Sequence, residues 1–169
     1  MKNYLTKNLL LTLTLLSGLT IINMPAHASA QNSLAKADTD TKALEAASKI
    51  QKACDNTELT INIDWTKFDS YDYESHKLTQ SNVMKNFGGV IGSYASYISY
   101  LCDTEAYAGT YKPLIQALTA INFQVTDTIK PENYKEQVTA SSDGTTLTII
   151  TRPNNLAASH EKEIIDLAF

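Results

Sequence analysis

The residues whose types could do chemistry gather in the stretch 66–81, which mixes aromatic and acidic side chains without a clear period. Tyrosines combine a large apolar surface with a polar tip and are favoured at recognition surfaces. Carboxylates between them would select a basic or hydroxyl-rich partner. The alternative interpretation places Trp65 and Phe68 in the core and the tyrosines at the edge of the surface. The predicted binding residues are Asp69, Tyr71, Asp72, Tyr73 and His76.

His76 is the residue of this stretch that could act as a general base, because a histidine titrates near neutral pH and carboxylates flank it. This reading gives an alternative hypothesis, a small cell-envelope hydrolase that uses His76 with an acidic residue. The spacing of His76 from Asp69 and Asp72 matches no metal-binding pattern, and an exposed histidine between acids is common. His160 adds no further signal. The sequence therefore predicts no metal site and no cofactor.

Other parts of the chain hold no catalytic motif. Gly92 and Ser93 lack the second glycine of a nucleophile elbow, and no lysine completes a phosphate-binding loop around 88–92. We therefore predict a non-catalytic protein that binds another protein or a cell-envelope component, of the inhibitor or immunity type. A third hypothesis is a small-ligand carrier with a tyrosine-lined cavity between the central helix and the sheet. A second tyrosine group has helical spacing, which is typical of core or core-edge positions; it comprises Tyr94, Tyr97 and Tyr100.

The N-terminal region has the pattern of an export signal, with a positive start, an apolar run over 9–22 and small residues after it. A membrane span needs roughly 20 apolar residues, so the run is too short for an anchor. We expect cleavage after Ala28 or Ala30 and favour Ala30. The sequence thus predicts a cleaved signal peptide over 1–30 and one exported domain over 31–169. This domain would be periplasmic or secreted, with no membrane span.

The predicted exported domain is acidic. The full chain has 14 basic and 18 acidic residues, and removal of Lys2 and Lys7 leaves 12 against 18, a net charge of −6. Binding to nucleic acid requires a basic patch that neutralises phosphates, and the sequence contains no cluster of lysine or arginine. Nucleic acid is therefore excluded as a partner. An acidic surface suits solubility or, by electrostatic steering, a basic partner.

Cys54 and Cys102 are the only cysteines, and both lie in the predicted exported domain. In an oxidising compartment an isolated pair of this kind most often forms a disulfide. A redox or metal role is disfavoured, because the sequence has no C-x-x-C motif and no histidine near either cysteine. Closing this loop would stabilise the fold by about 4 kcal/mol in the chain-entropy description.

The elements that must position these residues follow from hydrophobic periodicity. The stretch 82–102 has apolar residues at helical spacing and a stripe of small residues that would admit a neighbouring backbone. Residues 31–37 are expected to fray. Three other helices are predicted: one that starts at 38–40 and ends at 54, one over 111–120, and a closing helix that starts at 155 or 159. The predicted strands are 59–65, 122–129, 134–140 and 145–151, and a turn at 142–144 separates the last two. We expect a small single α+β domain, with a mainly antiparallel sheet of about four strands packed against the central helix and flanking helices.

Overall fold

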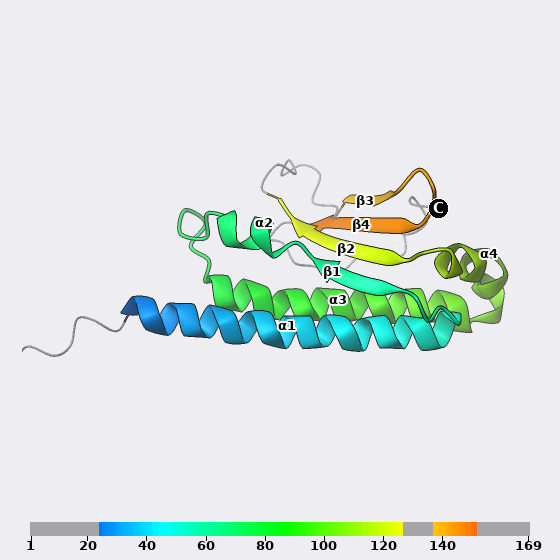
Figure 1. Ribbon diagram of the computed structural model, residues 1–169, viewed down its shortest axis with the longest axis horizontal. Coiled ribbons are helices and arrows are strands. Elements are labelled where there is room, and N and C mark those ends of the chain that lie inside the picture. The colour runs from blue at the N-terminus through cyan, green and yellow to red at the C-terminus, as the bar shows by residue number, and fades with distance from the viewer. Residues whose placement is uncertain (1–23, 127–136, 152–169) are drawn as a thin grey trace, which may run out of the picture.

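Helices and a four-stranded sheet form two layers in the described part of the chain (Figure 1). The computed structural model describes residues 24–126 and 137–151. The elements in chain order are α1 (Met24–Cys54), β1 (Thr60–Ile63), α2 (Trp65–Ser70), α3 (Gln80–Asp103), α4 (Glu105–Gln116), β2 (Ala120–Val125), β3 (Gln137–Ala140) and β4 (Thr146–Thr151). The long helices α1 and α3 lie side by side under one face of the sheet. The predicted α+β class is confirmed.

The helices α1 and α3 run in the same direction, and their contacts keep a nearly constant separation in sequence. Thr39 Oγ1 donates a hydrogen bond to Met84 O over 2.7 Å, and Lys49 Nζ donates one to Ser96 Oγ over 2.9 Å. At the carboxyl ends of both helices the predicted disulfide joins Cys54 to Cys102. The bridge therefore fixes two parallel helix ends to each other.

The helix α1 begins earlier than expected, at Met24, so the prediction that residues 31–37 fray is wrong. Ala35 is completely buried against the core, and Asn32 Nδ2 donates a hydrogen bond to Gln80 Oε1 over 2.7 Å. These tertiary contacts stabilise helical turns in which the local sequence shows no clear start signal.

The sheet is mixed and mostly parallel, which corrects the prediction of a mainly antiparallel sheet. Its strand order is β1-β2-β4-β3, with β1–β2 and β2–β4 parallel and only β3–β4 antiparallel. The chain leaves β1, passes through three helices and returns beside β1 as β2 (Figure 1). A crossover of this kind brings the second strand back in the same direction, whereas a short hairpin would reverse it.

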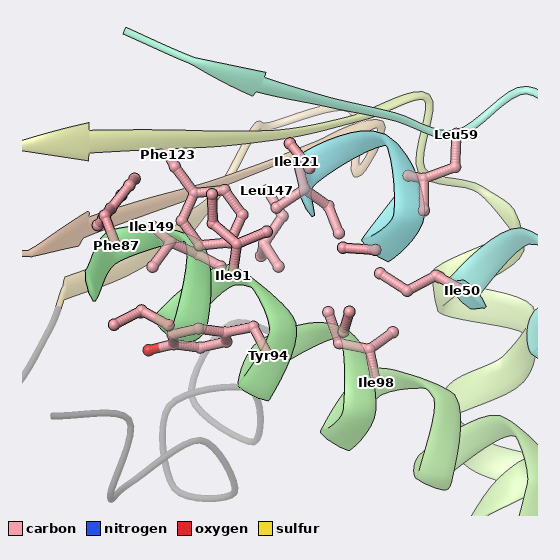
Figure 2. Packing of buried hydrophobic residues seen from close by; sticks show 14 of the residues in the cluster. Ile50, Leu59, Phe87, Ile91, Tyr94, Ile98, Ile121, Phe123, Leu147 and Ile149 are labelled. Atoms are coloured by element: carbon pink, nitrogen blue, oxygen red, sulfur yellow. The ribbon is translucent and has the colours of Figure 1, made fainter. Parts of the chain in front are cut away.

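The inner face of the sheet forms the core with α1 and α3. Alternate residues of β2 and β4 are buried, as their period-two pattern requires. The rings of Phe87 and Tyr94 each meet Phe123 at 5.8 Å between centroids. These rings pack against one another between α3 and the sheet. Figure 2 labels the residues that meet there: Ile50, Leu59, Phe87, Ile91, Tyr94, Ile98, Ile121, Phe123, Leu147 and Ile149.

The boundaries of β1 and α4 also differ from the sequence prediction. The first strand ends at Ile63, because Asp64 caps α2 by accepting a hydrogen bond from Lys67 N over 3.4 Å. Part of the expected loop 66–81 is therefore helical. The helix α4 begins at Glu105 and not at 111, because only Thr104 interrupts the helical backbone after α3, and Pro113 lies near the end of α4.

The predicted turn at 142–144 is confirmed. Gly144 adopts a φ of +69°, and its backbone N donates a hydrogen bond to Ser141 O over 2.9 Å. Hydrogen bonds from Ser141 and Thr145 lower the pKa of Asp143 to about 2. The turn joins β3 to β4 as a hairpin. The expected closing helix from 155 or 159 lies outside the described residues.

Candidate interaction site

The predicted contact stretch folds around Tyr73, which belongs to the core. Its side chain is 9% exposed, and its hydroxyl donates a hydrogen bond to Phe68 O over 2.8 Å. Burial raises the pKa of Tyr73 above the ordinary value for tyrosine. Tyr73 therefore positions the turn after α2 and presents little surface to a partner.

Tyr71 and His76 lie beside Tyr73, so three of the five predicted binding residues come together. The Tyr71 ring is 5.0 Å from the Tyr73 ring and stacks on the His76 ring at 5.3 Å between centroids. Tyr71 is half-buried, whereas His76 is exposed. The surface available to a partner in this ring cluster is thus mainly the imidazole of His76.

The two predicted carboxylates hold the chain in its turn. Asp72 Oδ1 accepts a hydrogen bond from Ser75 N over 3.1 Å, and the Ser75 hydrogen bonds are the main cause of the lowered pKa of Asp72. Asp69 Oδ1 accepts a hydrogen bond from Gln80 Nε2 over 3.2 Å, which ties α2 to α3. The charge of His76 also contributes to the lowered pKa of Asp72, so the imidazole lies near this carboxylate. Within residues 24–126 and 137–151, no group of three or more histidine, cysteine, aspartate or glutamate side chains could hold a metal ion.

Phe68 and Trp65 follow the alternative interpretation to different degrees. Phe68 is fully buried, with its ring 4.6 Å from that of Phe87. Trp65 is half-buried, and its Nε1 donates a hydrogen bond to Asp40 over 2.8 Å while Lys36 Nζ lies 5.0 Å from the indole centroid. These contacts hold α2 against α1, so Trp65 has a structural role in joining the two helices.

A second aromatic group lies on α3 and α4 and forms a continuous series of ring contacts. The centroid distances are 6.3 Å from Tyr97 to Tyr100, 5.7 Å from Tyr100 to Tyr107 and 6.4 Å from Tyr107 to Tyr111. All lie within the range of favourable aromatic pairs. Tyr100 is 50% exposed, and the other three are half-buried. We call these four residues the tyrosine ladder.

A shallow groove along α3 ends at the tyrosine ladder. Its lining residues are Gly89, Gly92, Ser93, Ser96 and Tyr97. Tyr100 lies one turn beyond Ser96 and Tyr97, so ladder and groove share the face of α3 that is turned away from the sheet. The small residues of α3 thus lie on two different faces of the helix. At Gly88 a Cβ atom would lie 2.6 Å from Lys42 Cδ of α1, whereas at Gly92 a Cβ would meet no described atom within 4 Å.

Sequence reasoning identified part of the ladder. It placed Tyr94, Tyr97 and Tyr100 on one helix as core or core-edge residues, and Tyr94 is indeed buried. Tyr107 and Tyr111 were missed, because the predicted start of the following helix at 111 left Tyr107 outside it. The signal that could have found them is their spacing of four residues, which places two side chains on one helical face.

Comparisons add no family to this description, since no family model, curated protein or solved structure matches the chain. No helix in the described ranges is long and apolar enough to cross a membrane. The disulfide is consistent with an extracellular or periplasmic protein, because such bonds persist in oxidising compartments.

Proposed function

We propose that this chain is an exported, non-catalytic binding protein and that the tyrosine ladder is the surface that contacts its partner, a protein or a cell-envelope component. The observation that carries the proposal is the continuous contact of four tyrosine rings on the surface of two helices, with Tyr100 half exposed. Tyrosine is enriched at protein interfaces, where it provides a large contact area with few rotatable bonds.

The helices hold this surface in place before any partner arrives. Cys102 follows Tyr100 by two residues, and its disulfide to Cys54 fixes the end of α3 to α1. Lys112, which follows Tyr111 in α4, forms an ion pair with Asp55 over 2.6 Å. Such preorganisation reduces the conformational entropy that is lost on binding and so favours affinity.

The proposal is tested by site-specific photo-crosslinking in the source cell. A benzoylphenylalanine is placed at Tyr100, at His76 or at Leu44, a side chain of α1 that is 73% exposed. We expect a covalent adduct of one defined mass from position 100 and none from position 44. An adduct only from position 76 would move the contact surface to the turn after α2. No adduct from any position would contradict a stable macromolecular partner.

A loss-of-contact variant provides the second measurement. The double variant Tyr100→Ala with Tyr107→Ala lacks two neighbouring rings of the ladder. Its ability to compete for the partner with the photo-crosslinking protein is compared with that of Leu44→Ala. We expect the double variant to compete at least about tenfold less well, as is typical of aromatic residues at the centre of an interface. Far-ultraviolet circular dichroism checks that both variants keep the fold.

A further inference from the structure

We infer that the tyrosine ladder binds a segment rich in arginine or lysine, which gives the partner a chemical class. This inference rests on the proposed function. It follows from the charges around the ladder, from the quadrupole of the phenol rings and from a contact of the same kind inside this chain.

Near the ladder, the charges that α3 and α4 themselves carry are predominantly negative. From Asn86 to Tyr111 the sequence contains no lysine or arginine, and this span includes most of α3 and most of α4. The junction between the two helices contributes two exposed carboxylates, Asp103 and Glu105. Lys112 is the nearest following cation, and its ammonium group is paired with Asp55. On the groove side, Lys49 of α1 donates a hydrogen bond to Ser96 Oγ, so a basic partner would meet the least like-charge repulsion at the end of the ladder that carries Asp103 and Glu105.

The rings themselves favour a cation. The face of a phenol ring carries partial negative charge and attracts an ammonium or guanidinium group within about 6 Å of the centroid. Tyr100 exposes half of its surface between ladder neighbours on either side. The chain already uses this contact elsewhere, because Lys36 Nζ lies 5.0 Å from the centroid of Trp65. A planar guanidinium can stack on such a ring while it donates hydrogen bonds to a carboxylate.

The test titrates the full protein, with its disulfide intact, with a nonaarginine peptide, and uses nonaglutamate and a glycine–serine peptide as control ligands. Calorimetry gives the affinity, and the ring resonances of the tyrosines locate the site. We expect the arginine peptide to bind and to shift the ladder resonances. Tyr100→Ala with Tyr107→Ala should weaken binding about fivefold, in line with the energy of exposed cation–π contacts.

A charge-matched pair of variants separates a local site from the general attraction of an acidic protein. Asp103→Asn with Glu105→Gln removes two carboxylates at the ladder, and Glu45→Gln with Glu74→Gln removes two exposed carboxylates elsewhere. We expect the first pair to weaken binding about fivefold and the second to change it less than twofold, because exposed charges interact only over about a Debye length. Equal effects of both pairs, or no binding of the arginine peptide, would overturn the inference.

The inference and the proposed function can fail separately. If position 100 crosslinks to a partner whose contacting segment lacks lysine and arginine, the ladder is a binding surface and the inference about its partner is wrong. If the arginine peptide binds at the ladder but no photo-adduct forms in the cell, the chemical preference stands and the proposed function is wrong.

Discussion

At the scale of single residues, Asn56 has the most demanding position in the described structure. Its amide lies in the turn between α1 and β1 and is 5% exposed. Nδ2 donates hydrogen bonds to Ile115 O and Leu118 O, each over 2.8 Å. Oδ1 accepts hydrogen bonds from the backbone N of Glu58 and of Leu59, each over 3.2 Å. One side chain thus joins the end of α4 to the start of β1.

We expect Asn56→Ala to lower the free energy of unfolding by about 3 kcal/mol, because it leaves buried carbonyl and N–H groups without partners. Urea denaturation followed by circular dichroism measures the change. Asn62→Ala is the control, since Asn62 is exposed and its Nδ2 donates a hydrogen bond to Asn122 Oδ1 over 3.0 Å. It should change the free energy of unfolding by no more than about 0.5 kcal/mol. Similar effects at both positions would contradict this role of Asn56.

Tyr73 is expected to give the protein an alkaline limit. In an unfolded chain tyrosine ionises near pH 10, and burial raises the folded-state pKa of Tyr73 above that value. The stabilisation from keeping Tyr73 protonated is therefore fully present below about pH 10 and is lost as the pH rises through the folded-state pKa. Denaturation measured from about pH 9 upward should show this loss begin above about pH 10. Tyr73→Phe should remove this loss of stability at alkaline pH, whereas Tyr100→Phe, at an exposed position, should keep it.

At the scale of the elements, local patterns predicted which segments are helices or strands better than they predicted how the strands pair. The apolar period of α3 and the alternation in β4 are properties of short windows, and both elements were predicted close to their observed bounds. The partner of β1 depends on a crossover through α2, α3 and α4, and nothing in the stretch 59–65 identifies β2 as that partner. Whether the strands pair in parallel or antiparallel could therefore not be predicted from strand patterns alone.

Within α3, two glycines on different faces should respond differently to alanine. Alanine in a helix interior is favoured over glycine by about 1 kcal/mol. At Gly92 the added methyl group meets no described atom within 4 Å, so Gly92→Ala should raise the free energy of unfolding by about 0.5–1 kcal/mol. At Gly88 the methyl group would lie 2.6 Å from Lys42 Cδ, so Lys42 must move and the gain is offset. Thermal denaturation that ranks Gly88→Ala equal to or above Gly92→Ala would contradict this difference.

The disulfide connects two elements, α1 and α3, across a sequence separation of 48 residues. Restricting the unfolded chain over a loop of this length should stabilise the folded state by about 4 kcal/mol in the chain-entropy description. Reduction with dithiothreitol should lower the free energy of unfolding by up to that amount. The double variant Cys54→Ala with Cys102→Ala should match the reduced protein and be insensitive to dithiothreitol. Unchanged stability on reduction would show that the bridge does not restrict the unfolded chain.

At the scale of the whole molecule, the candidate surface depends on how separate elements come together. The sequence indicated a surface in the stretch 66–81 because aromatic and acidic residues are close in the chain there. Folding places Phe68 and Tyr73 inside, and it uses Asp69 and Asp72 as hydrogen-bond acceptors for the backbone and for Gln80. The ladder arises only where the end of α3 meets α4, so its four rings become neighbours through tertiary structure.

The same tertiary arrangement predicts how the disulfide affects folding kinetics. The pairing of β1 with β2 joins Thr60 to Ala120, positions 60 residues apart in the chain. In the oxidised chain the path runs 6 residues from Thr60 to Cys54, across the bridge, and 18 residues from Cys102 to Ala120, about 25 in all. Loop closure costs about (3/2)RT ln n, so the shorter path should make refolding of the oxidised protein about fourfold faster.

Stopped-flow refolding from urea, with and without dithiothreitol, measures this ratio, and the variant Cys54→Ala with Cys102→Ala reports the rate without the bridge. The prediction requires that β1 and β2 pair in the rate-limiting step, since only then does their loop-closure entropy enter the barrier. Equal folding rates with a lower stability on reduction would place the whole effect of the bridge on unfolding. The kinetics thus show whether the parallel pair of β1 and β2 forms before or after the rate-limiting barrier.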